Sequence, residues 1–287
     1  MRNPIKEAYK KVQRELMLRR DRSEAATWLD ARLMQELHQK NRQLLRTVPE
    51  WIDDRIWKES IFQYGLPANV RHLIDLDIGE GASYTDAMLA LSKNLTGPIR
   101  YLEIGVSVGR NFFQVANYFE NASLTGFDIE EINPKLADYF EIESRREFAT
   151  AVASIKKCPS SLTRLHYRRQ RNTVDYLSGD VFDPIAWQQL SGRKFNIIFS
   201  DAFHSAEALQ TEAREILRQN LMDPGEVIVV WDDLHNEMAQ VFRDICEAFG
   251  HARPKCRSNS FIVPLKGWLG DNWEDHPVGL FISLPRR

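Results

Sequence analysis

From Ile99 to the end of its 287 residues, the chain alternates short apolar runs with stretches of helical periodicity. The apolar runs are residues 101–104, 124–127, 173–177, 195–199 and 227–231. Strands that alternate with helices form βαβ units and a parallel sheet, which needs helices on both faces. Ligands of such sheets bind beyond the carboxyl ends of the strands. The pattern therefore predicts an α/β fold with its site along one edge of the sheet.

Two further parts flank this alternation. Two more apolar runs, residues 261–265 and 279–284, are expected to form a hairpin at the edge of the sheet. Apolar residues at spacings of three and four before Ile99 predict helices instead of strands. These helices are expected around residues 5–16, 28–45, 52–62 and 84–94. We therefore expect an N-terminal helical extension (1–95), which covers the site or builds a dimer, and a domain (96–287) with a doubly wound, mostly parallel seven-stranded sheet.

Composition excludes several classes of protein. The 38 basic residues nearly balance the 40 acidic ones, for a formal net charge of −2, so no overall charge favours nucleic acid. No apolar run approaches the ~20 residues of a membrane span. The cysteines, Cys158, Cys246 and Cys256, show neither a metal-binding nor a disulfide pattern. We therefore expect a soluble, cytoplasmic protein that binds neither nucleic acid nor a membrane.

The first apolar run leads into a turn that contains glycine, and a helix follows the turn. A dinucleotide fingerprint, G-x-G-x-x-G, uses three glycines for close approach to a pyrophosphate. When that motif is started at Gly105, Ser107 and Arg110 occupy its second and third glycine positions. The turn is therefore a poor match to a dinucleotide site.

The same turn also matches a serine hydrolase motif. Residues 105–109 read G-x-S-x-G, and Asp201 and His235 could complete a Ser-Asp-His triad with Ser107. A nucleophilic serine of this kind normally follows several strands, whereas this turn follows the first strand of the chain. A hydrolase that uses Ser107 is therefore kept as an alternative from another class.

Acidic residues end the successive apolar runs. Glu103 ends the first run, and Asp128 ends the second, 25 residues later. Asp180 follows the third run, Asp201 the fourth, and the pair Asp232 and Asp233 the fifth. Because the carboxyl ends of parallel strands meet at one edge of the sheet, these carboxylates are expected to lie close together.

In this order, these motifs resemble those of the class I S-adenosylmethionine-dependent methyltransferases, and in particular the small-molecule, catechol-type O-methyltransferases. The resemblance covers the chain from about residue 99 to its end. It implies a Rossmann-like fold, although Ser107 replaces a glycine of many members. The residues it implies for contact with S-adenosylmethionine are Glu103, Gly105, Ser107, Gly109, Asp128, Ile129, Asp180, Val181 and Asp201.

Three carboxylates are candidates for a metal site. Asp201, Asp232 and Asp233 follow two strands and could bind a hard divalent cation such as Mg²⁺. Their spacing resembles the metal triad of the catechol-type enzymes. In that family the metal binds the acceptor oxygen and lowers its pKa. Two alternatives stay open, because Asp233 could cap the following helix and Asp201 could contact the cofactor.

Candidate bases lie beside these carboxylates. His204 and His235 follow them closely, and a histidine titrates near neutral pH, so each is a candidate catalytic residue together with Asp201. His276, in the final loop, is a weaker candidate. The connection 129–172 is long, and it contains an expected helix over 134–157 and a basic stretch over 164–171.

The resemblance implies transfer of a methyl group from S-adenosylmethionine to a hydroxyl group of a small molecule, with Mg²⁺ as an expected metal. Methylation of nitrogen on the same fold is the nearest alternative. A cofactor-binding module without catalysis is the alternative that is not an enzyme. We also expect a homodimer. The acceptor, and the roles of the extension and the long connection, are left open by the sequence.

Overall fold

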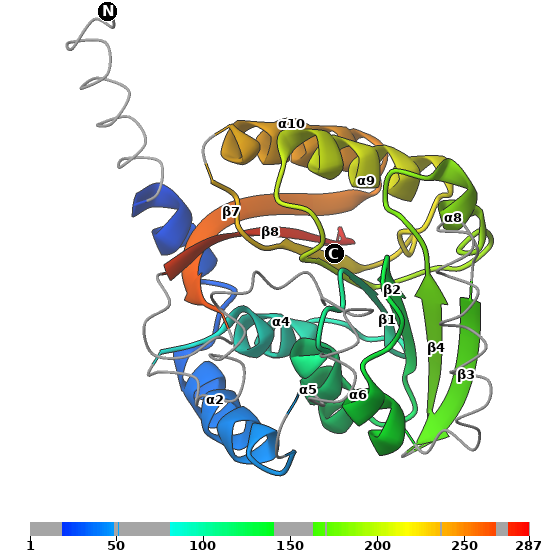
Figure 1. Cartoon of the computed structure of the whole chain (residues 1–287). Helices are drawn as coiled ribbons and strands as arrows, with labels where there is room; N and C mark the ends of the chain where they lie inside the picture. Colours follow the sequence, from blue (N-terminus) through cyan, green and yellow to red (C-terminus); the bar gives the residue numbers. More distant parts are fainter. Residues whose placement is uncertain are drawn as a thin grey trace, which may run out of the picture.

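The computed structural model describes residues 19–48, 51, 81–140, 163–169, 171–235, 237–267 and 275–286. Its centre is an eight-stranded sheet with the order β3-β4-β2-β1-β5-β6-β8-β7. The strands are β1 (Arg100–Ile104), β2 (Ser123–Asp128), β3 (Thr163–Arg169), β4 (Asn172–Ser178), β5 (Ile197–Ser200), β6 (Val227–Trp231), β7 (Cys256–Lys266) and β8 (Asp275–Pro285). Figure 1 shows this sheet between two layers of helices.

The strand order confirms the predicted fold class. Five parallel strands, in the order β4-β2-β1-β5-β6, are continued by the antiparallel strands β8 and β7. These seven strands have the arrangement of a class I methyltransferase sheet. The expected hairpin at the edge is confirmed as β7 and β8.

The eighth strand, β3, was not predicted. It pairs antiparallel with β4 at the edge of the sheet, within the stretch that was expected to be only a basic connection. Its residues Leu165 and Tyr167 alternate with polar and basic residues. Edge strands commonly carry charged residues, so their apolar signal is weak.

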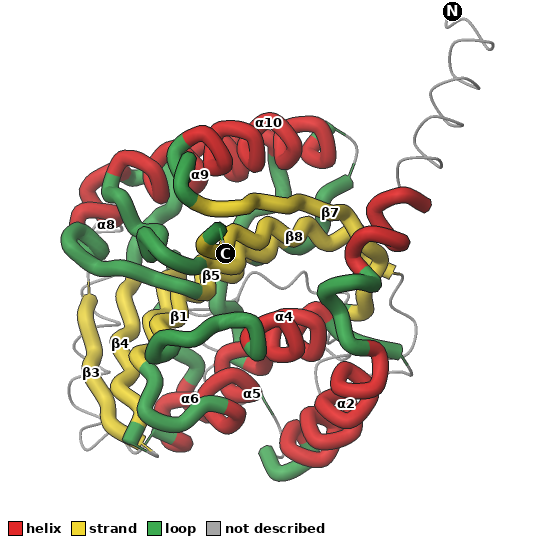
Figure 2. The backbone as a smooth tube through the Cα atoms, turned by 180° about the vertical axis from the view of Figure 1, so that it is seen from behind, coloured by secondary structure: helices red, strands yellow, loops and turns green. Residues whose placement is uncertain are grey.

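Helices cover both faces of the sheet. One layer contains α2 (Ala31–Leu45), α4 (Tyr84–Ser92), α5 (Arg110–Tyr118) and α6 (Pro134–Tyr139), and the other contains α8 (Pro184–Gln188), α9 (Ala206–Arg218) and α10 (Met238–His251). Figures 1 and 2 show the two layers from opposite sides. Each layer packs against its own apolar cluster, because successive residues of a strand face opposite sides. All five residues of β6 are buried, as expected for a strand covered on both faces.

Buried polar contacts attach the N-terminal helices to this sheet. Asp21 accepts hydrogen bonds from Arg243, at 2.7 Å, and from the backbone N of Ile262 in β7, at 3.0 Å. Asp86 of α4 is 2.9 Å from Nδ1 of His38 and accepts a hydrogen bond from Asn41 of α2 at 2.6 Å. Asp21 therefore joins the extension to α10 and β7, whereas Asp86 joins two helices within the extension. The division at residue 95 stays a prediction.

Several expected elements lie outside the described residues. They are the helices over 5–16 and 52–62 and the part of the helix over 134–157 that follows α6. Within the described part of the chain, no helix combines the length and the apolar character that crossing a membrane requires.

Candidate active site

The turn after β1 packs directly on the turn after β5. Gly105 has a φ of +79° and Gly109 has a φ of +87°, and Ser107 between them also has a positive φ of +53°. A Cβ at Gly105 would lie 2.4 Å from the backbone O of Asp201, and one at Gly109 would lie 2.5 Å from Leu136 of α6. Both glycines are therefore required by conformation and by close approach.

Gly105→Ala is expected to be much more destabilising than Gly192→Ala, although both glycines have a φ of +79°. Nothing lies within 4 Å of a Cβ at Gly192, so that change costs only the ~1–2 kcal/mol of a left-handed alanine. At Gly105 the added methyl group meets backbone atoms, which adds roughly 1–3 kcal/mol. Urea unfolding of the two variants measures the difference, and equal losses would contradict the close approach.

A cavity of about 340 Å³ opens at the carboxyl ends of β1, β2, β4 and β5. Its lining consists of Gly105, Ser107, Asp128, Ile129, Asp180, Val181, Phe182, Asp201, Ala202 and Phe203. All the residues expected to contact the cofactor are among them, except Glu103 and Gly109. The structure therefore brings residues from four separate loops to one cavity, where the sequence placed a binding site.

Asp128 joins two of these loops. One carboxylate oxygen accepts a hydrogen bond from the backbone N of Ser107, at 2.8 Å, and the other accepts one from the backbone N of Glu130, also at 2.8 Å. Burial raises the pKa of Asp128 above its ordinary value, and these hydrogen bonds oppose the increase. The side chain both lines the cavity and holds the turn after β1.

Glu103 lies outside the cavity, in contrast to Asp128. It is buried, it accepts hydrogen bonds from Tyr101 at 2.6 Å and Asn111 at 2.9 Å, and it does not line the cavity. Burial raises its pKa well above the ordinary value for glutamate. Asn111 also accepts a hydrogen bond from Thr85 of α4 at 2.7 Å. Glu103 therefore links β1 to α5 and α4 below the turn.

Apolar side chains form the rim of the cavity. Ile129 is 58% exposed, Phe182 40% and Phe203 62%. The two phenylalanine rings meet edge to face, with their centroids 6.0 Å apart. The charged side chains of the lining are carboxylates, and no lysine or arginine is among the described residues that line the cavity. This combination suits a positively charged organic ligand with a flat ring better than a phosphorylated one.

Beside the cavity, carboxylates and imidazoles alternate in a chain. His204 is 2.8 Å from Asp201 through Nε2 and 3.1 Å from Asp233 through Nδ1. His276 Nδ1 is 3.1 Å from Asp233 and 2.9 Å from Asp232. The three carboxylates expected to bind a metal therefore do lie together, but imidazole rings stand between them.

His204 is held as an imidazolium. Burial lowers the pKa of a histidine, but the hydrogen bonds and charges of Asp201 and Asp233 outweigh burial here and raise the pKa of His204 to about 11. The ring is then protonated at neutral pH and cannot accept another proton in this state. That His204 acts as a base stays a prediction. In such a role, the ring would first have to give its proton to another group.

Two further expectations were a hydrolase triad that includes His235 and a helix cap formed by Asp233. His235 contacts Asp233, at 3.3 Å, whereas Asp201 contacts His204, so Asp201 and His235 do not form the pair that a hydrolase triad needs. Helix α10 begins only at Met238, after Glu237, so Asp233 does not cap it. Asp233 instead has a φ of +55° and contacts three histidines.

The residues grouped closely enough to share a metal differ from the expected set. Among the described residues, ligand atoms of Asp232, Asp233 and His276 lie within 4.8 Å of one another. Asp201 is not in this group. Oδ1 of Asp232 is buried and has no hydrogen-bond partner among the described residues, so it is an unused acceptor there. Burial and the neighbouring charge of Asp201 raise the pKa of Asp232 to about 6, against the contact with His276.

The β-hairpin brings His276 to this place. His276 lies at the start of β8, and β8 pairs with β6, whose last residue precedes Asp232. The sequence placed His276 in the final loop, which made it a weaker candidate than His204 and His235. The available signal was a histidine next to the start of an expected strand.

A carboxyl group lies under the same strand ends. Glu212 of α9 is buried and accepts hydrogen bonds from Ser200 and Trp231. Burial outweighs these hydrogen bonds and raises the pKa of Glu212 from 4.5 to about 7. No sequence pattern singled out this residue, since a glutamate on an amphipathic helix is normally exposed.

Glu212 is expected to make stability depend on pH. A carboxyl group with a raised pKa binds more protons in the folded chain, so its stabilising contribution is present below the unfolded pKa and is lost as pH rises through the folded pKa. Between about pH 4.5 and about pH 8, the free energy of unfolding should fall by roughly 1–3 kcal/mol relative to Glu212→Gln. Urea titrations of both chains across this range measure it, and a constant difference would contradict the shift.

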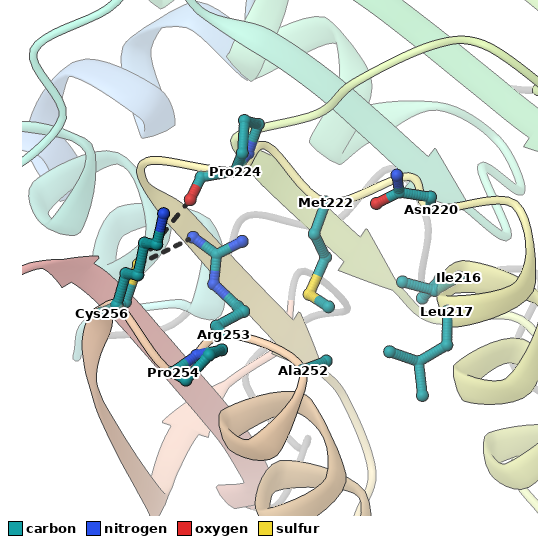
Figure 3. A pocket seen from close by; sticks show the side chains of 10 residues that line it. Ile216, Leu217, Asn220, Met222, Pro224, Ala252, Arg253, Pro254 and Cys256 are labelled. Carbon is teal, nitrogen blue, oxygen red and sulfur yellow. Dashed lines mark hydrogen bonds between the residues drawn. The ribbon is translucent and has the colours of Figure 1, made fainter.

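Two other cavities in the described part of the chain contain none of the expected site residues. One of about 290 Å³ lies between the ends of α9 and α10 (Figure 3). Figure 3 shows Arg253 at its wall. Its guanidinium group donates hydrogen bonds to the backbone O of Asp223 and, at 2.8 Å, to Oγ of Ser283. Arg253 therefore joins β8 to the loop before β6. The catalytic candidates all lie at the opposite ends of these strands.

No protein-family model and no curated protein matches the sequence. The strand order decides the architecture. The chain has the fold of the class I methyltransferases.

Several solved structures are similar in architecture. A putative O-methyltransferase from Klebsiella pneumoniae is 18% identical, with a TM-score of 0.43, over 83% of this chain and 98% of that one. The O-methyltransferase TomG from Streptomyces achromogenes is 16% identical, with a TM-score of 0.43, over 95% and 98%. An O-methyltransferase from Bacillus cereus is 13% identical, with a TM-score of 0.42, over 95% and 99%. At these identities and TM-scores, the similarity says nothing about the activity of this chain.

Proposed function

We propose that this class I methyltransferase fold transfers a methyl group from S-adenosylmethionine to a hydroxyl group of a small molecule. One observation carries the proposal: the cavity at the strand ends combines carboxylates and an apolar rim, with no lysine or arginine among its described lining residues, and it adjoins a cluster of acids and histidines. S-adenosylmethionine carries a sulfonium, an ammonium and an adenine ring, and it has no phosphate. Its charges and ring match this lining.

Different residues of the cavity lining would bind different parts of S-adenosylmethionine. The resemblance assigns Asp128 to the ribose hydroxyls and Asp180 to the adenine amino group. Phe182 and Phe203 can cover the adenine, since flat apolar rings pack well against aromatic side chains. Asp201 lines the cavity and contacts His204, so it connects the cofactor site to the cluster. Methyl transfer is an in-line displacement, for which holding both reactants in place supplies much of the rate.

We propose that Asp232, Asp233 and His276 hold a divalent cation. The leftover acceptor on Asp232 and the grouping of the three side chains fit such an ion. Three carboxylates favour Mg²⁺, the ion first expected, whereas an imidazole in the donor set suits Mn²⁺ and related ions better. When bound, a cation of this kind lowers the pKa of a hydroxyl group that contacts it.

A transfer assay tests the function. The purified chain is incubated with methyl-labelled S-adenosylmethionine, Mn²⁺, and a panel of catechols, phenols, sugars and amines, and S-adenosylhomocysteine is measured. We expect product with a hydroxyl acceptor, loss of product with a chelator, and recovery with Mn²⁺. Product with amines alone would support methylation of nitrogen. Binding of the cofactor without product on any acceptor would favour a module that does not catalyse.

A further inference from the structure

A single carboxylate oxygen lies beneath the two strands that carry the candidate metal and catalytic residues. Oε2 of the buried Glu212 accepts hydrogen bonds from Oγ of Ser200 and from Nε1 of Trp231, the latter at 3.1 Å. Ser200 and Trp231 are direct neighbours in the register of β5 and β6. One atom of α9 therefore contacts both strands at the same level.

Each of the two residues that donate to Glu212 comes immediately before an acid of the site in the sequence. Ser200 is followed by Asp201, and Trp231 is followed by Asp232 and Asp233. The two strand ends are also joined by their backbones, because the N of Asp232 donates to the O of Ser200 at 3.0 Å. Any shift of one strand end relative to the other must therefore break or bend the contacts with Glu212.

A carboxyl group is an energetically unfavourable side chain for this buried position. Removing a charge from water costs free energy, and an apolar residue of similar volume often gives equal or greater stability. The pKa of Glu212 is raised by burial, and the charges of His204 and Asp201 also act on it, so the group is electrostatically linked to the site above it. A role in the geometry of that site accounts for a carboxylate at this position.

We propose that Glu212 is a positioning residue that ties the end of β5 to the end of β6 and so sets the place of Asp201 relative to Asp232 and Asp233. This inference rests on the proposed function, because it assigns these acids to a working site. Glu212 neither lines the cofactor cavity nor belongs to the group that could hold a metal. Its direct contacts with the two strands are the hydrogen bonds from Ser200 and Trp231.

Two variants and a matched control separate this role from general support of the helix. Glu212→Leu removes both hydrogen bonds, whereas Glu212→Gln keeps an acceptor and a similar shape. Glu215 of the same helix is also buried, but it pairs with Arg218, at 2.6 Å, away from the strand ends. Glu215→Gln therefore removes a buried charge from α9 without touching β5 or β6. Ser200→Ala removes one of the two donors and serves if Glu212→Leu does not fold.

The measurement is calorimetric titration of the full chain with Mn²⁺ alone and with S-adenosylmethionine alone. Changing a residue that supports metal ligands typically weakens metal binding ~10–100-fold. We expect this for Glu212→Leu, because Glu212 holds Trp231, which directly precedes the proposed ligands Asp232 and Asp233. Glu212→Gln should recover most of the affinity, and Glu215→Gln should match the wild type. Binding of S-adenosylmethionine should stay within a few-fold throughout. A folded Glu212→Leu chain with wild-type Mn²⁺ affinity would overturn the proposal.

A second readout separates this proposal from the proposed function. If the wild type binds no Mn²⁺, the metal part of the proposed function fails, and crystal structures of the variants then decide about Glu212. We expect the contacts of His204 with Asp201 and Asp233 to lengthen beyond hydrogen-bond distance in Glu212→Leu and to persist in Glu212→Gln. Unchanged contacts in the leucine variant would overturn the positioning role.

Discussion

Replacing Asp128 with alanine is expected to weaken binding of S-adenosylmethionine by roughly 100-fold or more, because hydrogen bonds to a charged group contribute ~1.5–3 kcal/mol each. The change removes the carboxylate that is proposed to accept hydrogen bonds from the ribose hydroxyls. It also releases the backbone N of Ser107, which Asp128 holds at 2.8 Å. Calorimetric titration of both chains with the cofactor measures the loss.

Asp138→Ala is the matched control for this change. Asp138 is an exposed carboxylate in α6, and it does not line the cavity. Its loss should leave the affinity for S-adenosylmethionine unchanged. Wild-type affinity in a folded Asp128→Ala chain would contradict the assignment of the cavity to the cofactor.

Replacing His276 with alanine is expected to abolish measurable binding of Mn²⁺, a loss of more than the ~10–100-fold that changing a supporting residue costs. His276 supplies the single imidazole in the group with Asp232 and Asp233. Binding of S-adenosylmethionine should be nearly unaffected, since His276 does not line the cofactor cavity. The free Mn²⁺ signal in electron paramagnetic resonance measures the bound fraction.

Asp201→Asn distinguishes the observed grouping from the one first expected. The sequence predicted a metal site of Asp201, Asp232 and Asp233, whereas the structure groups His276 with the last two. We therefore expect Asp201→Asn to retain Mn²⁺ binding while His276→Ala loses it. The reverse result would restore the three-carboxylate site and reject the role of His276.

The fold could be predicted from the sequence because its strands leave a strong signal. The run 227–231 is apolar at every position, and it forms β6 with the same bounds. Strand β3 lacked such a signal, since an edge strand does not need to be apolar throughout. Helical periodicity was also visible, since the helix expected over 84–94 is α4, which ends within two residues of that range.

The candidate site was predictable only where chain order alone brings residues together. Asp128 and Asp201 follow parallel strands, so topology places both at the cavity. The direction of the Glu103 side chain depends on packing against α5, and the sequence did not show it. The position of His276 depends on the hairpin register, and the charge on His204 depends on Asp233 of another strand. Both are tertiary effects that no local pattern contains.

Calorimetric titration of the full chain with S-adenosylmethionine tests the central claim most directly, with ATP as a phosphorylated comparison. The lining of the cavity, with carboxylates and without lysine or arginine, predicts saturable binding of one S-adenosylmethionine per chain, competition by S-adenosylhomocysteine, and no binding of ATP. The absence of saturable binding of S-adenosylmethionine to the folded chain would contradict the account.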